Sequence, residues 1–237
     1  MPLLAHLEEL RSRLIRCLIA VAVGFGICYA VSAPLLRFFL APIREALPDG
    51  GNIVFRQIAE PFLIYMKVAF LAGLFLASPW VFFEIWRFVS PGLKARERRL
   101  ALPFVFGATT LFILGGLFGY YVLLPMTVGF LLQIGSDFQA QLDLRSAFSF
   151  EAWILLGLGL VFQIPVLIAL LARAGLVTAR WLWKMFRYAI VGIFLIAAIL
   201  TPTPDIVTQT VFAAPMLALY LLGIGIAALV APRPDPG

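Results

Sequence analysis

The chain has 237 residues, of which 63% are hydrophobic and only 13% are charged. An ordinary soluble domain has roughly 45–50% apolar and about 25% charged residues, so this composition indicates an integral membrane protein. Because a transmembrane helix needs about 20 apolar residues, the chain has room for roughly six spans and none for a sizeable soluble catalytic or nucleotide-binding domain. The net charge of +6 must therefore be placed relative to a bilayer before it indicates any partner.

The uncharged runs predict one all-α domain, residues 1–237, with six transmembrane helices. An amphipathic segment at about 4–16 is expected on the membrane surface before the first span, which is retained and not a cleaved signal. The third run is too long for one straight span, and Pro125 with the turn at 135–137 predicts a helix followed by a loop. The last two helices are expected to be short and to form a tight hairpin. The expected spans are about 17–36, 62–86, 100–127, 148–172, 185–200 and 206–229.

Lysine and arginine are distributed unevenly over the connections between these spans. With the N-terminus on one side of the membrane, that side carries thirteen of the 18 basic residues, and the other side carries five, including Lys67 near the start of the second span. Cytoplasmic loops carry an excess of basic residues, so both termini are predicted to be cytoplasmic. The charge pattern thus predicts a multi-pass protein of the cytoplasmic membrane.

Motifs for catalysis or metal binding are missing from the sequence. His6 is the only histidine, so an HExxH zinc site cannot form, and the two cysteines cannot supply a four-ligand cluster. There is no GxxxxGK[ST] phosphate loop and no GxSxG serine elbow. We therefore expect neither an enzyme nor a metal ion or other cofactor.

Polar residues within spans are costly and are functional candidates in a membrane protein. Gln163 interrupts the fourth run just before Pro165, which is expected to kink the helix. Its amide could satisfy backbone groups loosened by the kink, or it could bind a polar group on a partner helix. Asp205 and Gln209 lie one turn apart at the start of the last helix, where Asp205 is most simply an N-cap. Glu84, at the edge of the second span, is the remaining candidate of this kind.

Three carboxylates, Glu8, Glu9 and Glu97, lie among many arginines and lysines on the predicted cytoplasmic side. Such surface carboxylates usually form weak exposed pairs. Alternatively, one carboxylate from the N-terminal segment and one from the next cytoplasmic segment could converge and accept guanidinium groups through bidentate hydrogen bonds. The second interpretation predicts a receptor for an arginine-bearing segment.

Several short segments form a spaced set of motifs that extends over nearly the whole chain. They are 6–11 (HLEELR), 78–79 (SP), 86–93 (WRFVSPGL), 97–99 (ERR), 162–165 (FQIP) and 201–209 (TPTPDIVTQ). Taken in this order, the segments specifically resemble the TatC family, the polytopic core of the twin-arginine protein translocase.

This resemblance implies a non-enzymatic receptor that binds twin-arginine signal peptides and recruits single-span partners resembling TatA and TatB. We expect it to work in membrane lipid as a hetero-oligomer with several copies and without a nucleic-acid partner. Folded cargo proteins would then cross the membrane, driven by the proton-motive force. It implies that Glu9 and Glu97 accept the paired arginines, with Leu10, Arg11 and Phe88 shaping the surface. The residues implied in contacts with partner helices are Gln163, Thr201, Asp205 and Gln209, and the loops 37–60 and 135–151 would form a cap.

Many family members carry glutamate where this chain has Gln163, and a neutral amide cannot carry a proton. The competing hypothesis is a small-solute transporter or permease subunit, which would favour helices broken at the midplane and paired internal repeats. A third class, an intramembrane hydrolase, lacks a nucleophile and base in this sequence. Binding of Arg–Arg and Lys–Lys signal peptides would separate the receptor from both alternatives.

Overall fold

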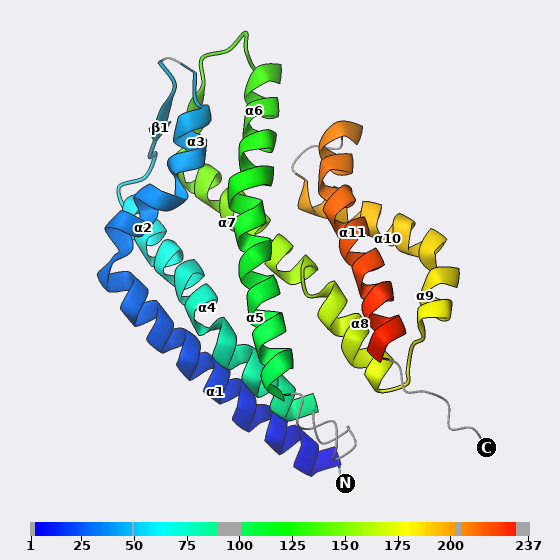
Figure 1. Cartoon of the computed structure of the whole chain (residues 1–237). Helices are drawn as coiled ribbons and strands as arrows, with labels where there is room; N and C mark the ends of the chain where they lie inside the picture. The colour runs from blue at the N-terminus through cyan, green and yellow to red at the C-terminus, as the bar shows by residue number, and fades with distance from the viewer. Residues whose placement is uncertain (1–2, 49, 90–100, 202–204, 231–237) are drawn as a thin grey trace, which may run out of the picture.

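Long apolar helices dominate the computed structural model, which describes residues 3–48, 50–89, 101–201 and 205–230 (Figure 1). The all-α class is therefore confirmed, with one small pair of strands added. The elements, in chain order, are α1 (Leu3–Ala30), α2 (Ser32–Phe39), α3 (Ala41–Ala46), β1 (Asn52–Val54), α4 (Glu60–Val89), α5 (Ala101–Phe118), the π-helical segment η3 (Gly119–Leu123), α6 (Leu124–Ile134), β2 (Gln141–Asp143), α7 (Leu144–Val161), α8 (Ile164–Arg173), α9 (Ala179–Lys184), α10 (Phe186–Leu200) and α11 (Ile206–Val230).

Helices of membrane-spanning length account for most of the described residues. Five helical stretches are long and apolar enough to cross a bilayer, namely Leu7–Ala30, Glu60–Val89, Leu102–Ile134, Leu144–Arg173 and Ile206–Val230. The shorter apolar helix Phe186–Leu200 coincides with the fifth predicted span. Each predicted span overlaps an apolar helical stretch, although α1 ends at Ala30 and residues 32–36 of the first predicted span lie in α2. Of the last two helices, α10 is short as expected, with 15 residues, whereas α11 is longer than expected, with 25 residues. The number of membrane crossings stays a prediction.

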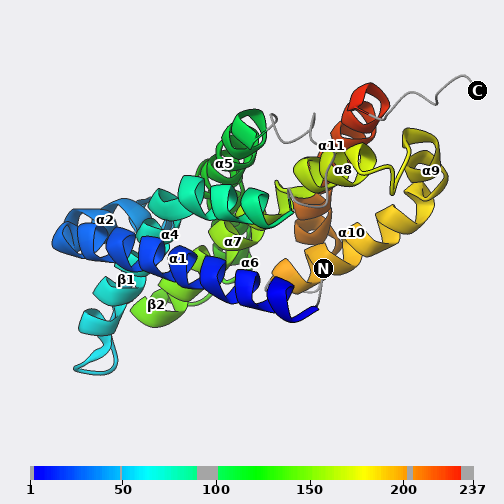
Figure 2. The same cartoon turned by 90° about the horizontal axis from the view of Figure 1, so that it is seen from below.

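The helices are distributed across the molecule roughly in chain order. Figure 2 shows α1 and α4 at one side of the molecule and α9, α10 and α11 at the other, with α5 and α7 between them. The beginning of α1, the end of α4 and the end of α11 all lie at one end, which we call the N-terminal end (Figure 1). The opposite end carries β1 and β2, and we call it the strand end.

Two prolines have opposite effects on the long helices. The helical run from α5 continues through Pro125 to Ile134, past the expected end near Thr127. The π-helical segment η3 directly precedes this proline, where the helix must accommodate a missing backbone donor. In the fourth stretch, α7 ends at Val161 and α8 begins at Ile164 with Pro165 in its first turn, which confirms the predicted kink.

Small residues allow two pairs of helices to pack closely. A Cβ atom added at Gly73 of α4 would lie 2.6 Å from the Phe25 backbone nitrogen of α1. A Cβ at Gly115 of α5 would lie 2.6 Å from the Leu158 carbonyl oxygen of α7. Close packing of this kind drives helix association where both lipid and side chains are apolar. These contacts fix the positions of the helix ends that carry the candidate sites.

The strand end is held together by backbone pairing that the all-α prediction did not include. Strand β1 pairs in parallel with β2, with Ile53 opposite Leu142. The buried Glu60 carboxylate accepts hydrogen bonds from the backbone N–H groups of Arg56 (2.9 Å), Gln57 (3.2 Å) and Arg145 (2.8 Å). This carboxylate therefore joins the segment before α4 to the start of α7, and the two loops form a single cap.

Candidate functional site

A cluster of charged side chains joins α1 to α4 near the N-terminal end. The Arg13 guanidinium donates to Glu9 Oε1 from Nε (3.1 Å) and Nη2 (2.5 Å), and to Glu84 Oε2 from Nη1 (3.0 Å). The Glu84 side chain is 1% exposed and that of Arg13 is 14% exposed, whereas that of Glu9 is 32% exposed. Arg16 Nη1 lies 3.9 Å from Glu84 Oε1. One guanidinium thus bridges a buried carboxylate and a partly accessible one.

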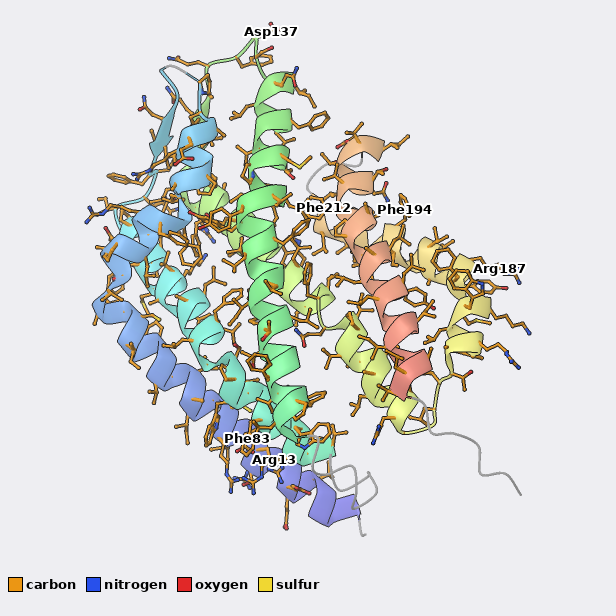
Figure 3. All side chains as sticks on the ribbon, viewed as in Figure 1. Arg13, Phe83, Asp137, Arg187, Phe194 and Phe212 are labelled. Carbon is orange, nitrogen blue, oxygen red and sulfur yellow. The ribbon has the colours of Figure 1, made fainter. Side chains whose placement is uncertain are left out.

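Helix geometry explains how this cluster forms. Glu9 and Arg13 are four residues apart on α1, so their side chains lie on the same face one turn apart. Glu84 approaches the same guanidinium from α4, 71 residues further along the chain. Figure 3 labels Arg13 on α1 near the N-terminal end of the molecule. The sequence indicated Glu84 as a candidate, but its partner Arg13 was missed, although the Glu9–Arg13 spacing could have indicated half of the cluster.

The other residues expected to bind a signal peptide are placed as follows. Leu10 and Arg11 are exposed on α1, next to Glu9. Phe88 is half-buried in the last turn of α4, one turn beyond Glu84. Glu97, the second expected arginine acceptor, lies outside the described residues. The structure thus brings Glu9, Leu10 and Arg11 together and places Phe88 at the same end of the molecule.

Gln163 lies at the kink between α7 and α8 and is buried. Its side-chain Nε2 donates to the Ala108 carbonyl oxygen of α5 (3.1 Å) and to the Gly159 carbonyl oxygen (3.4 Å). In a regular helix the Gly159 carbonyl would accept from the Gln163 backbone N–H, but at the kink this N–H donates to the Leu160 carbonyl oxygen (3.0 Å). The amide therefore does what the simpler sequence interpretation expected, and it also connects α7 to α5.

The remaining three candidates lie at the junction of α10 and α11. Asp205 accepts from the Thr208 backbone N–H (2.8 Å) and from the Thr208 hydroxyl, which confirms it as the N-cap of α11. Gln209 Nε2 donates to the Phe194 carbonyl oxygen (2.9 Å) and so connects α11 to α10. Thr201 is buried just after α10, with its hydroxyl 3.4 Å from the Ala198 carbonyl oxygen. Gln209 thus joins the last two helices, while Asp205 caps the start of α11 and Thr201 bonds to the end of α10.

One buried carboxyl in α7 was not expected from the sequence. Glu151 is fully buried, and neither of its side-chain oxygens has a hydrogen-bond partner among the described residues. The predicted span 148–172 begins only three residues before Glu151, and the loop 135–151 implied by the family resemblance ends on it, so neither expectation placed this carboxyl in a buried part of a helix. The helix begins earlier, at Leu144, capped by Asp143, whose side chain accepts from the Ser146 backbone N–H (3.0 Å) and hydroxyl (2.8 Å). That capping pattern was the available signal.

Nothing in the described part of the chain resembles a metal centre, since no group of three or more histidine, cysteine, aspartate or glutamate side chains is placed to hold an ion. The polar groups above can instead bind other polar groups. A carboxylate that accepts two hydrogen bonds from one guanidinium, as Glu9 does, is suited to the recognition of arginine.

Comparison with known families assigns this arrangement of helices and motifs. The family model described as Sec-independent protein translocase protein (TatC) matches residues 5–215. The chain belongs to the TatC family. This result confirms the family resemblance of the sequence motifs, and it identifies the chain as a multi-pass membrane protein of a non-enzymatic transport family.

Individual TatC proteins and structures support this assignment. The TatC protein of Koribacter versatilis is 45% identical over 236 residues, which cover 98% of this chain and 87% of the relative. TatC of Escherichia coli K12 is 35% identical, with 94% of this chain and 86% of the relative covered. A crystal structure of the twin-arginine translocase receptor TatC matches with a TM-score of 0.82 at 33% identity, covering 95% of this chain and 99% of that one.

TatC membership also decides between the classes of protein that the sequence left open. The relatives are named as protein translocase components, not as small-solute transporters or hydrolases. The second TatC crystal structure, determined in DDM, matches with a TM-score of 0.84 at 32% identity over 94% of this chain. We therefore retain translocation of proteins as the function and set the transporter hypothesis aside.

Proposed function

We propose that the chain is the receptor subunit of a twin-arginine translocase and binds signal peptides at its N-terminal end. The observation that carries the proposal is the Glu9–Arg13 pair, in which an accessible carboxylate already accepts a guanidinium through two hydrogen bonds. The crystal structure named as a twin-arginine translocase receptor supports it, because it covers 95% of this chain. Glu9 is thus proposed to accept an arginine of the signal peptide.

Recognition of arginine follows from the chemistry of this surface. A guanidinium offers a planar fork of donors that fits a carboxylate, whereas a lysine ammonium is a compact point charge. Glu97 is proposed as the second acceptor, so that two carboxylates receive two arginines. Leu10 and Arg11, both exposed beside Glu9, would contact the peptide, and Phe88 would form part of an apolar surface at the end of α4. Arg13 holds Glu84 as well as Glu9, so it would position the Glu9 carboxylate.

Partner helices of the TatA and TatB kind are proposed to bind around α10 and α11. Gln209 and Asp205 brace the start of α11, and Thr201 ends α10, so these residues would shape the docking surface. Gln163 is bonded within its own chain, so it would act by holding the kink between α7 and α8. Export of folded cargo would draw on the proton-motive force and require no bound cofactor.

We also propose the orientation of the chain. The beginning of α1 and the end of α11 lie at the same end of the molecule (Figure 1). The excess of lysine and arginine predicted for the side that holds both termini makes this end cytoplasmic. The membrane would be the cytoplasmic membrane of a bacterium, or the corresponding archaeal or organellar membrane, and the strand end would face the opposite side.

Signal-peptide binding can be tested with the purified chain in lipid discs. A labelled Arg–Arg peptide should bind at least tenfold tighter than its Lys–Lys counterpart, because hydrogen bonds between charged groups contribute about 1.5–3 kcal/mol each. Glu9→Ala and Glu97→Ala should each remove most of this preference. Glu8→Ala, which removes an exposed carboxylate beside Glu9, is the matched control and should retain it. An unchanged Arg-over-Lys preference in both Glu9→Ala and Glu97→Ala would refute the proposal.

The partner surface needs a separate measurement, co-purification of TatA-type and TatB-type proteins with the chain. Gln163→Leu and Gln209→Leu should reduce co-purification more than signal-peptide binding. Gln133→Leu makes the same chemical change at an exposed position in α6 and should have no effect. Full recovery of partners with both Gln163→Leu and Gln209→Leu would count against this surface.

A further inference from the structure

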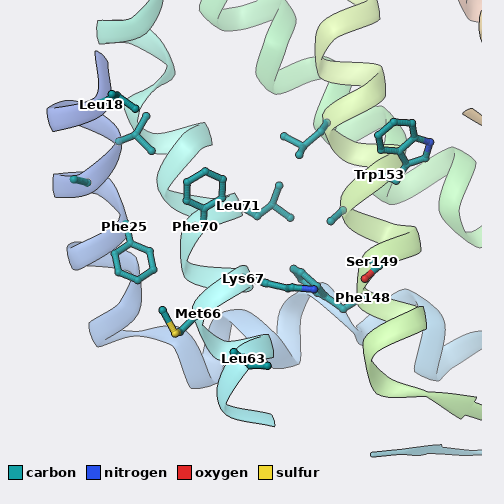
Figure 4. Close-up of a pocket in the computed structure, with 14 residues that line it drawn as sticks. Leu18, Phe25, Leu63, Met66, Lys67, Phe70, Leu71, Phe148, Ser149 and Trp153 are labelled. Atoms are coloured by element: carbon teal, nitrogen blue, oxygen red, sulfur yellow. The ribbon is translucent and has the colours of Figure 1, made fainter. Parts of the chain in front are cut away.

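An apolar groove with a volume of about 780 Å³ lies between α1, α4 and α7, outside the proposed signal and partner surfaces (Figure 4). Its walls are almost entirely hydrocarbon and aromatic. The lining residues used below are Leu18, Phe25, Lys67, Phe70, Ser149 and Trp153. Because the helices that form it are of membrane-spanning length, the groove opens toward lipid, and its occupant must be compatible with a bilayer.

Two polar side chains lie near one end of this groove. Figure 4 shows Lys67 extending from α4 toward α7, with the Ser149 hydroxyl close by. Lys67 is exposed, and it has no hydrogen bond or ion pair with any described residue. A cation at membrane depth is costly unless it reaches the interface or meets an anion. The groove therefore presents an ammonium donor and a hydroxyl donor, and neither has an acceptor among the described residues.

The position of Lys67 gives the groove a direction. Lys67 lies seven residues after Glu60, which is held in the cap at the strand end, so it is about 10 Å along α4 from that cap at 1.5 Å per residue. Side chains of a helix tilt toward its N-terminus, which for α4 is toward the strand end. The groove continues the other way along Phe70 and Trp153 to Leu18 (Figure 4). It is thus polar near the membrane surface and apolar toward the membrane centre.

The charge of the groove distinguishes between occupants. An apolar spanning helix seated here would leave the Lys67 ammonium without an acceptor at membrane depth, which is costly. An acyl chain is thinner and apolar throughout, and it carries its polar headgroup at one end, as the groove does.

We propose that this groove binds an anionic phospholipid of the leaflet at the strand end. The phosphate accepts hydrogen bonds from the Lys67 ammonium and the Ser149 hydroxyl, and an acyl chain runs past Phe25, Phe70 and Trp153 toward Leu18. Charge complementarity selects an anionic over a zwitterionic headgroup, because the positively charged choline group of a zwitterionic lipid would repel the Lys67 ammonium. The bound lipid would connect α1 and α4 to α7 along the open side of the molecule.

The proposal can be tested with the purified full-length chain in detergent. Phosphatidylglycerol and phosphatidylcholine with identical acyl chains are titrated, and the shift of the unfolding midpoint and the lipid retained per chain, counted by mass spectrometry, are measured. Phosphatidylglycerol should half-saturate both readouts at a concentration at least tenfold lower than phosphatidylcholine. Lys67→Gln should abolish this preference, and Lys67→Arg should keep it. Arg37→Gln, which neutralises another exposed cation near the strand end, is the matched control and should also keep it.

A second variant tests the groove without changing its charge. Ala152→Phe places a ring in the groove and should lower retention of both lipids at least tenfold, even if Lys67→Gln does not fold. Equal binding of the two lipids to the wild type, or an unchanged preference in Lys67→Gln, would overturn the proposal. A photoreactive residue at Trp153 that crosslinks in membranes to a partner helix and not to phospholipid would also overturn it.

Discussion

Arg13→Met removes the guanidinium that pairs with the buried Glu84 carboxylate at 3.0 Å. Breaking a buried ion pair by removing one partner costs about 3–5 kcal/mol, because the remaining charge is left uncompensated. Arg16 still lies 3.9 Å from Glu84, so we expect the lower figure, about 3 kcal/mol. For a chain of this size that corresponds to a fall of about 6–12 °C in the midpoint of thermal unfolding.

The assay is thermal unfolding of the purified chain in a fixed detergent, followed by tryptophan fluorescence. Arg16→Met makes the same change one turn further along α1, where the side chain is 48% exposed, and should cost less than about 1 kcal/mol. The double variant Arg13→Met with Glu84→Met should unfold within about 1 kcal/mol of the wild type, because apolar residues often replace a buried pair without loss.

Two results would refute this reasoning. If Arg13→Met and Arg16→Met lower the midpoint equally, burial of the pair does not set the cost. If the double variant is less stable than Arg13→Met alone, the orphaned Glu84 carboxylate is not the cause of the loss.

Three further predictions concern stability and use the same assay. Gly73→Ala should destabilise the chain by about 1–3 kcal/mol because its new Cβ meets the α1 backbone, whereas Gly26→Ala meets nothing within 4 Å and should not; equal midpoints for the two would be contrary evidence. Glu151→Leu should raise stability by about 1–3 kcal/mol because it removes a buried carboxyl that has no partner among the described residues, and a lower midpoint would contradict this. The hydrogen bonds from the Ser146 hydroxyl and backbone N–H lower the pKa of Asp143. The wild type should therefore be more stable than Asp143→Asn above about pH 4, and this advantage should disappear as pH falls through the lowered pKa. A stability difference between the two proteins that does not change with pH would exclude this titration.

Features that depend on neighbours in the sequence were predicted well. The apolar runs located the helical stretches because about 20 consecutive apolar residues have no other stable environment than a membrane. The kink at Pro165 followed from the missing donor of proline, and the cap at Asp205 followed from the position of this residue at the start of the last helix. The family could also be predicted from the sequence, because its motifs are short segments whose order and spacing are visible in the sequence alone.

Interactions between distant segments could not be read in this way. Arg13 meets Glu84 across 71 residues, and Glu60 meets the Arg145 backbone across 85 residues, so nothing local indicates either contact. Whether Glu151 is buried or exposed depended on where α7 begins and which helices pack on it, and the position of Lys67 in a groove depended on the space between three helices. Composition and local spacing therefore determined which segments are helices in a membrane. Only the tertiary structure decided which charges are paired, because charges far apart in the sequence become neighbours through the packing of the helices that carry them.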